Sequence, residues 1–416
     1  MRGRCGANAD FHEHASCSDL FVFMIRKILI AGAGIGGLTA ASCLMKAGYD
    51  VEVYEQAPEL SEIGAGIQLS ANAMHVLNYL GLGKAIAELS VRPGAYVFRL
   101  HDTGEIIGQF PLADEHERLN GAPYNQLHRA DLHDLLAAKA REFNKDVVRL
   151  NRRVAGFTEN AAGVELFFAD GSRARADLLI GADGVKSAVR KQIAGDDHAA
   201  YTGDAAWRLT IPADQLPDNF MGEVMSVWMG PGRHVVCYYL RGGALLNFVG
   251  LVETEDISEE SWTAKFPWER LKADFAGWHE NIQSVIDRAD KDSCFRWSLY
   301  YRPPIETWST RSATLLGDAV HATLPYLAQG ACMAIEDAAV LTRALQSTNV
   351  VADALQLYER NRIERTSRIV KGSDANRTLF HMRDQKKLRQ AFAARDEGAD
   401  RNAWLYSYNP LTVTLT

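Results

Sequence analysis

Glycines and an acid near the start of the chain have the spacing of a dinucleotide-binding turn. In the segment AGAGIGG, Gly32 permits a tight turn, Gly34 lets backbone approach a pyrophosphate, and Gly37 lets a helix pack on a strand. The N-terminus of that helix then directs free amides and a partial positive charge at the phosphates. Glu55 follows 18 residues after Gly37, where a carboxylate accepts ribose hydroxyls and disfavours a 2′-phosphate.

Two later segments place an aspartate after an apolar strand. DLLIGADGVKSAVR carries Asp183, and LLGDAVHATLPYLAQGACMAIED carries Asp318. Either segment alone is typical of an ordinary turn. Together with the glycine turn, they indicate that one dinucleotide is held by pieces of chain far apart in sequence. A carboxylate at a strand end can hydrogen-bond a sugar hydroxyl, and a helix beginning at Gly330 and Ala331 can stabilise negative charge.

Hydrophobic patterning predicts the elements that position these residues. Residues 25–30 have the pattern of a buried parallel strand, residues 38–47 of a helix stopped by a glycine, and residues 49–55 of a second strand. Strand, helix, strand and acid all occur at the expected spacing. A dinucleotide-binding turn therefore explains the pattern better than a glycine-rich turn without a ligand. Two further strong helices are predicted over residues 331–346 and 352–371.

The composition is that of an ordinary globular protein. The 416 residues are 47% hydrophobic and 23% charged, with a formal net charge of −7. The acidic balance argues against nucleic-acid binding, and no run approaches the ~20 apolar residues of a membrane-spanning helix. Six scattered cysteines without a C-x-x-C pair favour reduced thiols in a cytoplasmic protein and predict no metal site. Residues 1–23 are expected to be a disordered extension.

The motifs together resemble those of a known family. From residue 24 to the end, the chain resembles the FAD-dependent aromatic hydroxylases of the para-hydroxybenzoate hydroxylase type. The matching segments are AGAGIGG, VYEQAP, IGAGIQLSANA, LHRADLH, IGADGVKSAVR and LLGDAVHATLPYLAQGACMAIEDAAVL. GPGRHVVCYYLRGG and the terminal WLY carry a narrower likeness to salicylate hydroxylase, with 3-hydroxybenzoate 6-hydroxylase and 6-hydroxynicotinate 3-monooxygenase close behind. The resemblance implies bound FAD, NADH or NADPH as reductant, and O₂ as co-substrate.

The resemblance also implies which residues contact the cofactor. Arg129 is expected at the FAD pyrophosphate, Asp318 at the ribitol or pyrophosphate side, and Gln68 near the flavin. Asp183 is expected near both FAD and the path of the nicotinamide. The full set of predicted cofactor-binding residues is Gly32, Gly34, Ile35, Gly36, Gly37, Glu55, Gln56, Gln68, Arg129, Asp183, Asp318, Gly330 and Ala331.

A histidine and a tyrosine are the predicted catalytic and substrate-binding residues. An electrophilic oxygen attacks an electron-rich ring, so a phenolic substrate should be deprotonated or strongly hydrogen-bonded. In the strand at residues 232–240, His234, Val236 and Tyr238 share one face by period-two alternation. A histidine pKa near neutrality suits a general base. The alternative is that His234 is a purely structural histidine. Spacing alone favours that alternative, but the family likeness favours a functional role.

Two further residues are predicted to contact the substrate. A carboxylated ring needs a positive partner, and the candidates are Arg208, Arg233 and Arg241, of which Arg208 is assigned to the substrate. Taken one at a time, each is more typical of a surface or sheet-edge arginine. Pro325 stands where 3-hydroxybenzoate 6-hydroxylase has a glutamine, and Gln68 stands where 6-hydroxynicotinate 3-monooxygenase has a catalytic histidine. These two differences make 3-hydroxybenzoate and 6-hydroxynicotinate less favoured as substrates. They leave salicylate as the favoured substrate, converted to catechol with loss of its carboxyl group.

We expect a mixed α/β fold, in which a glutathione-reductase-like FAD domain is interrupted by a mostly antiparallel sheet domain. The predicted ranges are 24–92, 120–195 and 294–345 for the FAD domain, 93–119 and 196–293 for the substrate domain, and 346–416 for a helical C-terminal region. The protein is expected to be a monomer or homodimer. The alternatives from other classes are an oxidase or dehydrogenase that leaves the substrate carbon unchanged, and a flavin-free carrier of partner proteins.

Overall fold

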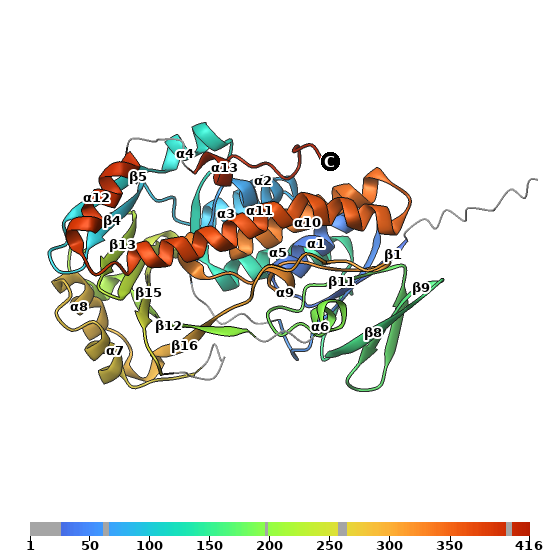
Figure 1. The fold of residues 1–416 in the computed structure, drawn as a ribbon, viewed down its shortest axis with the longest axis horizontal. Helices are drawn as coiled ribbons and strands as arrows, with labels where there is room; N and C mark the ends of the chain where they lie inside the picture. The colour runs from blue at the N-terminus through green and yellow to red at the C-terminus, as the bar shows by residue number, and fades with distance from the viewer. Residues whose placement is uncertain (1–25, 61–65, 196–198, 257–263, 397–401) are drawn as a thin grey trace, which may run out of the picture.

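A computed structural model describes residues 26–60, 66–195, 199–256, 264–396 and 402–416. The extension predicted at residues 1–23 lies outside these ranges. Two sheets of different construction form the two halves of the molecule, and the long helix α11 (Val351–Phe380) runs across both (Figure 1). Within the described ranges, no helix is long and apolar enough to cross a membrane.

A parallel sheet carries the glycine turn. Its strands, in order, are β17 (Ala313–Leu315), β11 (Leu178–Gly181), β1 (Lys27–Ala31), β2 (Asp50–Tyr54) and β7 (Val148–Arg149). β1 lies at the centre with its apolar side chains buried, which explains why its sequence is a continuous apolar run and does not alternate. The predicted strand–helix–strand unit is confirmed as β1, α1 (Ile35–Lys46) and β2.

Long helices pack together beside this sheet. α1 contacts both α5 (Arg129–Phe143) and α10 (Gly330–Ser347), and α10 in turn contacts α11. The helix predicted at residues 331–346 is confirmed. α11 extends beyond the predicted end at residue 371, because Leu379 and Phe380 in its last turn are buried in an apolar core of the second sheet.

A seven-stranded sheet forms the other half of the molecule. Its strands, in order, are β16 (Phe295–Tyr301), β12 (Ala200–Pro212), β15 (Leu245–Glu253), β14 (Arg233–Leu240), β13 (Met225–Gly230), β4 (Ala95–Leu100) and β5 (Ile106–Pro111). All neighbouring strands are antiparallel except β13 and β4, which are parallel. This agrees with the mostly antiparallel sheet expected from the sequence.

The predicted domain boundary at residue 294 requires correction. β16 lies beyond that boundary, yet it pairs antiparallel with β12, as Trp297 opposite Ala206 illustrates. The chain returns to the parallel sheet only at β17, which pairs with β11. The change from one half to the other therefore lies between Tyr301 and Ala313, and hydrogen bonding to β12 is the physical reason.

Alternation along β14 gives the seven-stranded sheet two different faces. Val235 and Cys237 belong to an apolar core shared with α7 (Trp268–Asp274) and α8 (Glu280–Asp287). His234, Val236 and Tyr238 line a cavity on the opposite face, as the period-two pattern predicted. His234 and Tyr238 therefore lie on the opposite face of the strand from α7 and α8.

The remaining elements are short. The strands are β3 (Gly66–Leu69) with β6 (Asn125–His128), and the antiparallel set β8 (Val154–Asn160), β9 (Gly163–Phe168) and β10 (Arg173–Ala176). The helices are α2 (Ala71–Tyr79), α3 (Gly83–Leu89), α4 (Ala113–Asn120), α6 (Ala188–Ala194), α9 (Asp318–His321), α12 (Gln385–Asp396) and α13 (Ala403–Tyr406). Single 3₁₀ turns are η1 (Ala213–Gln215), η2 (Arg241–Gly243), η3 (Lys291–Ser293) and η4 (Pro325–Leu327).

Candidate active site

A cavity of about 360 Å³ is lined by residues from both halves of the molecule. The predicted site residues that line it are Gly34, Ile35, Gly36, Gln68, Arg129, His234, Tyr238, Asp318, Pro325, Gly330 and Ala331. The predicted site residues that do not line it are Gly32, Gly37, Glu55, Gln56, Asp183 and Arg208. The fold thus brings most of the predicted cofactor and substrate residues around one space.

The glycine turn has room for a pyrophosphate. Gly32 has a φ of +98°, a left-handed conformation that few other residues adopt without strain. A Cβ atom at Gly34 would meet no other atom within 4 Å, so the backbone there borders open space in the cavity. At Gly37, in contrast, a Cβ atom would collide with the carbonyl oxygen of Gly32. The tight backbone at Gly32 and Gly37 agrees with the predicted turn, and the approach of a pyrophosphate at Gly34 stays a prediction.

The N-termini of three long helices meet at the cavity. α1, α5 and α10 begin at Ile35, Arg129 and Gly330, and all three residues line the space. In the described part of the chain, the residue at the N-cap of each of these helices makes no side-chain hydrogen bond to the first amides. Uncapped N–H groups and the positive ends of helix dipoles favour an anion, such as the pyrophosphate or reduced flavin ring of FAD.

Glu55 and Asp183 hold backbone in place. The Glu55 carboxylate accepts hydrogen bonds from the amides of Ala33 and Ala57, each at 2.9 Å, and so braces the glycine turn. Asp183 accepts hydrogen bonds from the Ser187 hydroxyl at 2.5 Å and the Ala188 amide at 2.8 Å, at the start of α6. Gln56 is exposed. Gly184, the residue after Asp183, lines the cavity, whereas Asp183 itself does not.

Asp318 presents a carboxylate to the cavity. It lies at the N-terminus of α9, is exposed, and makes no side-chain hydrogen bond to other described residues. Gly317, just before it, has a φ of +64° and donates its amide to Asp337 Oδ2 at 3.0 Å. The turn is therefore fixed by a buried side chain, while Asp318 stays available for a hydroxyl group of FAD.

Asp318→Ala is expected to weaken FAD retention. Loss of a hydrogen bond to a charged acceptor costs about 1.5–3 kcal/mol, which corresponds to roughly ten- to a hundredfold in Kd. Flavin absorbance of the purified protein before and after dialysis measures the effect. Asp146→Ala, which alters an exposed aspartate in the turn after α5, is the matched control. Equal retention in the two variants would contradict the placement of Asp318.

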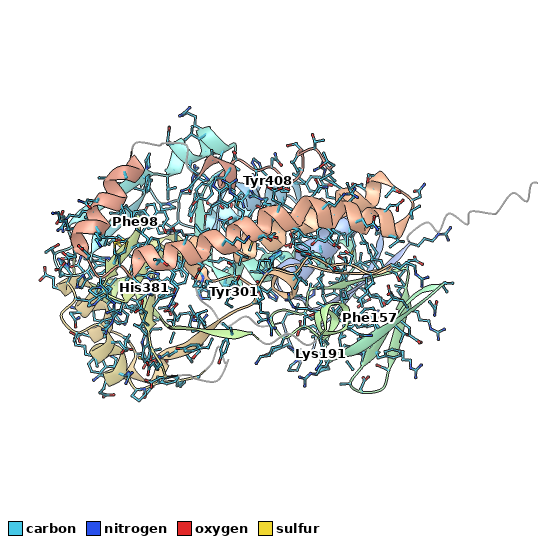
Figure 2. The ribbon with its side chains drawn as sticks, in the orientation of Figure 1. Phe98, Phe157, Lys191, Tyr301, His381 and Tyr408 are labelled. Carbon is cyan, nitrogen blue, oxygen red and sulfur yellow. The ribbon has the colours of Figure 1, made fainter. Side chains whose placement is uncertain are left out.

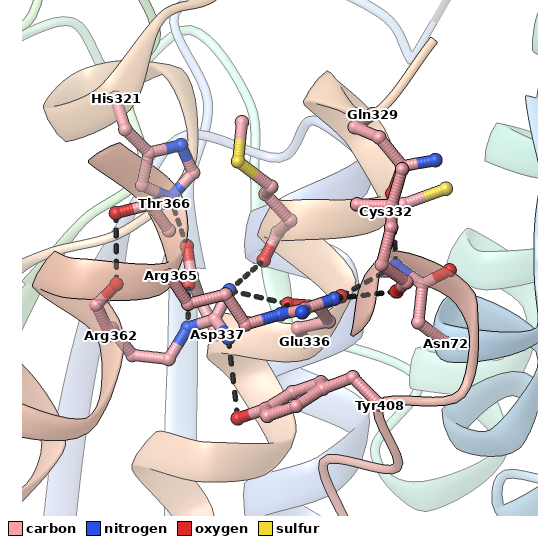
Figure 3. Close-up of polar contacts among 12 residues, drawn as sticks. Asn72, His321, Gln329, Cys332, Glu336, Asp337, Arg362, Arg365, Thr366 and Tyr408 are labelled. Atoms are coloured by element: carbon pink, nitrogen blue, oxygen red, sulfur yellow. Dashed lines mark hydrogen bonds and ion pairs between the residues drawn. The ribbon is translucent and has the colours of Figure 1, made fainter. Parts of the chain in front are cut away.

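A buried ion cluster supports this turn and the start of α10. Figure 3 shows Arg362 between Asp337 and Glu336, with Nε 2.7 Å from Asp337 Oδ1 and Nη2 2.7 Å from Glu336 Oε2. Asp337 Oδ2 also lies 2.6 Å from His321 Nε2, and Glu336 is paired with Arg365. Burial alone would raise the pKa of Glu336, but Arg365 and Arg362 hold it below its ordinary value. His321 is therefore part of this cluster.

His234 is a buried, neutral base at the cavity. Its side chain is 1% exposed, and its Nδ1 lies 2.9 Å from Nε2 of His381. Burial, and after it the neighbouring His381, lowers the pKa of His234 well below the ordinary value. The ring is therefore uncharged at neutral pH and can accept a proton. Among the described residues, its side chain makes no hydrogen bond through Nε2.

Tyr238 and Gln68 form one polar group at the cavity. The Tyr124 hydroxyl donates to Gln68 Oε1 at 2.5 Å, and the Gln68 amide donates to the Tyr238 hydroxyl. A Cβ atom at Gly66 would collide with the Tyr238 ring, so that glycine is what allows the ring to lie against β3. Burial raises the pKa of Tyr238, which keeps its hydroxyl protonated.

Arg208 lies behind the residues that line the cavity. It pairs across strands with Val249, which does line the space, and is therefore on the same face of the sheet. Its guanidinium lies 5.1 Å from the ring of Trp297 and is buried. It is close enough to Tyr238 to lower the pKa of that hydroxyl against the larger effect of burial. Its predicted contact with a substrate carboxylate stays a prediction.

The structure adds residues that sequence reasoning did not find. Thr323 and Tyr326 line the cavity beside Pro325, and Phe380 reaches it from the end of α11. His381 contacts His234 across 147 residues of sequence, so no local spacing identifies it. The described residues hold no cluster of three or more His, Cys, Asp or Glu side chains suited to a metal ion.

Comparisons with known proteins agree with this geometry. The FAD binding domain family matches residues 26–373. The chain is 36% identical over 390 residues to 3-hydroxybenzoate 6-hydroxylase of Polaromonas naphthalenivorans (strain CJ2), covering 92% of this chain and 96% of that protein. It is 38% identical over 383 residues to 3-amino-4-hydroxybenzoate 2-monooxygenase of Streptomyces cremeus, covering 91% and 94%.

A solved structure extends the likeness to the bound cofactor. Klebsiella pneumoniae HpxO, complexed with FAD and uric acid, has a TM-score of 0.81 to this structure at 28% identity, covering 91% of this chain and 97% of that one. The uncapped helix ends, the open face at Gly34 and the unengaged Asp318 fit the same cofactor. The chain therefore belongs to the FAD binding domain family, and it is a flavoprotein aromatic monooxygenase of the para-hydroxybenzoate hydroxylase type.

Proposed function

We propose that the protein hydroxylates the ring of a hydroxylated aromatic acid, with NADH or NADPH as the reductant and O₂ as the oxygen source. The observation that carries the proposal is the neutral His234 at the cavity, held at Nδ1 by His381. A neutral imidazole accepts a phenolic proton, and the phenolate is the electron-rich form that an electrophilic oxygen attacks.

The residues around His234 suit a ring of this kind. Bound FAD, once reduced, supplies with O₂ the electrophilic oxygen atom. His234 takes the phenolic proton at Nε2, and the Tyr238 hydroxyl orients a second polar substituent of the ring. Apolar side chains exclude water from the ring faces, and these are Met225, Val236, Val249, Leu251, Leu324 and Phe380.

Within this class we propose salicylate as the specific substrate, converted to catechol with loss of its carboxyl group. Gln68 is an amide held between Tyr124 and Tyr238, so it cannot act as the base that a histidine provides at this place in 6-hydroxynicotinate 3-monooxygenase. Pro325 lines the cavity and offers no side-chain hydrogen bond where 3-hydroxybenzoate 6-hydroxylase has a glutamine. 3-Hydroxybenzoate is the second candidate, favoured by the 36% identity to that enzyme.

Coupled turnover with product identification tests the proposal. The FAD-loaded protein is mixed with NADH or NADPH and with salicylate, 3-hydroxybenzoate or 6-hydroxynicotinate, and the products are identified by mass. We expect fast nicotinamide oxidation with salicylate and formation of catechol. A dihydroxylated acid from 3-hydroxybenzoate would move the assignment to that substrate. Peroxide with every ring left unchanged would contradict hydroxylation and favour an oxidase.

A further inference from the structure

A second histidine stands directly behind His234, on the side away from the cavity. His381 follows the C-terminal end of α11, at the end of that helix nearest the seven-stranded sheet (Figure 2). Its ring is buried, with its side chain 3% exposed, and its Nε2 lies 2.9 Å from His234 Nδ1. Because the two imidazoles are in hydrogen-bond contact, a proton can pass from one ring to the other without rotation of either side chain.

Two carboxylates face the outer nitrogen of His381. Its Nδ1 lies 3.4 Å from Glu253 Oε1 and 3.9 Å from Asp204 Oδ1. Asp204 is fully buried, but the Glu253 side chain is 35% exposed and pairs with the exposed Arg383 at 2.8 Å. The line from His234 through His381 to Glu253 therefore leads from the cavity to the protein surface.

The partners of Asp204 identify Glu253 as the group that exchanges with water. Asp204 accepts hydrogen bonds from Arg377 through both Nε and Nη2, and from the Tyr326 hydroxyl at 2.9 Å. A carboxylate so engaged is a poor proton acceptor, because its charge is already compensated. Glu253 has one exposed cation beside it and reaches solvent directly. Asp204 thus orients His381, and Glu253 is placed to pass a proton on.

The charge of the two carboxylates favours one tautomer of each ring. Nδ1 of His381 is buried and has no hydrogen-bond partner among the described residues, but it lies 3.4 Å from Glu253 Oε1, where the negative charge favours an N–H over a lone pair. His381 Nε2 then has a lone pair and accepts a hydrogen bond from Nδ1–H of His234 at 2.9 Å. His234 is left with a bare Nε2 at the cavity. This is the form that a base for a phenolic proton requires.

We propose that His381 and Glu253 form a proton relay that carries the phenolic proton from His234 to the surface, an inference that rests on the proposed function. The substrate O–H bond breaks as His234 Nε2–H forms. His234 Nδ1–H then passes to His381 Nε2, and His381 Nδ1–H passes to Glu253 and to water. No electron moves, and reversal of the same steps restores both tautomers when the product phenolate is protonated.

The environment of the two rings explains why a relay is needed. Burial lowers the pKa of both His234 and His381, which disfavours the charged, doubly protonated form of either ring. For His381, Asp204 and Glu253 oppose this effect, while Arg377 adds to it. A proton taken up at the cavity is therefore driven outward, where the only exposed acceptor next to His381 among the described residues is Glu253.

Proton release from the FAD-loaded enzyme tests the relay separately from turnover. Stopped-flow mixing of oxidised holoenzyme with salicylate or 3-hydroxybenzoate, in the presence of a pH-indicator dye, follows the proton that leaves on binding. We expect His381→Gln to slow release by on the order of 10²-fold, because glutamine hydrogen-bonds but does not relay protons. Glu253→Gln, close to the surface, should slow it less, and added imidazole should restore release in His381→Gly.

The controls separate the relay from the proposed function. His101 is another histidine near a carboxylate, with its Nδ1 3.8 Å from Asp102, and it lies outside the proposed relay. The His101→Gln variant should therefore release protons at the wild-type rate. Flavin absorbance confirms that each variant is loaded. Release by His381→Gln and Glu253→Gln at the wild-type rate, with hydroxylation intact in wild type, would overturn the relay alone. Wild-type enzyme that neither releases a proton nor hydroxylates either acid would overturn the proposed function and the relay with it.

Discussion

Replacing His234 with alanine is expected to lower kcat for ring hydroxylation by about 10²–10⁴-fold while the FAD content stays unchanged. The side chain lines the cavity, and in the proposed function its neutral nitrogen accepts the phenolic proton, whereas the predicted FAD contacts lie on other elements. Product formation, measured with the acid that wild type hydroxylates, is the decisive quantity. Flavin absorbance and nicotinamide oxidation are measured on the same samples.

The pH dependence of the wild type follows from the same residue. Because burial lowers the pKa of His234 well below its ordinary value, the basic form persists as the pH falls through 6.5. We therefore expect the acid limb of kcat/KM to lie below pH 6.5, and to be lost in His234→Ala. His75→Gln, at a half-buried histidine bonded to the Asn120 carbonyl outside the cavity, should keep wild-type kinetics. Full coupled hydroxylation by His234→Ala would remove this residue from the mechanism.

Features with a local signal were predictable from the sequence. The glycine turn is encoded by spacing within a few residues, and Gly32 and Gly34 have the backbone freedom and open space that this spacing implied. The shared face of His234, Val236 and Tyr238 follows from the two-residue repeat of any strand, and all three line the cavity. Such inferences need no knowledge of which strands are neighbours.

Features that depend on distant pairing were not predictable in this way. β16 was assigned to the wrong half because its pairing with β12 joins residues about a hundred positions apart. The contact between His234 and His381 spans 147 residues, and that between Tyr124 and Gln68 spans 56. No periodicity within one element records either contact. The sequence therefore predicted a histidine that does line the cavity, but not the buried groups that contact it.

Asp183 shows how a helix cap can resemble a ligand contact. Its segment reads DGVKSAVR, and an acid a few residues before a helix is also a common N-terminal signal. In the structure the carboxylate accepts hydrogen bonds from Ser187 and from amides at the start of α6. Glu55 likewise supports the backbone at Ala33. A carboxylate has about four acceptor positions, so two backbone contacts leave Glu55 capacity for a ribose hydroxyl.

Arg362→Met is expected to lower the free energy of unfolding by about 3–5 kcal/mol, because it leaves buried carboxylates without a cation. Arg362 is fully buried between Glu336 and Asp337 and also donates to the Met333 carbonyl at 3.3 Å (Figure 3). After the substitution Glu336 keeps Arg365, whereas Asp337 keeps only His321 as a side-chain partner among the described residues. Urea unfolding of the FAD-loaded protein, compared at constant m-value, measures the change.

The acid dependence of stability gives this prediction a second readout. The pKa values of Glu336 and Asp337 are held below their ordinary values by Arg365, Arg362 and His321 against the opposing effect of burial. Stability from such depressed pKa values is present at neutral pH and is lost as the pH falls through the folded-state values. Removal of Arg362 raises those values, so the variant should unfold at a higher pH than wild type.

A matched arginine on the surface separates the buried cluster from a general effect of lost charge. Arg118 pairs with Glu115 at 2.7 Å one turn away on α4, and its side chain is 66% exposed. Arg118→Met should leave the free energy of unfolding close to that of wild type, because solvent screens an exposed pair. If Arg362→Met were no less stable than Arg118→Met, the cluster would not hold α10 and α11 together. A large loss of unfolding free energy in Arg362→Met alone, with acid unfolding at a higher pH, would show that the cluster stabilises the packing of α10 and α11. Because Asp337 also accepts the Gly317 amide, the position of the turn before Asp318 would then depend on the same packing.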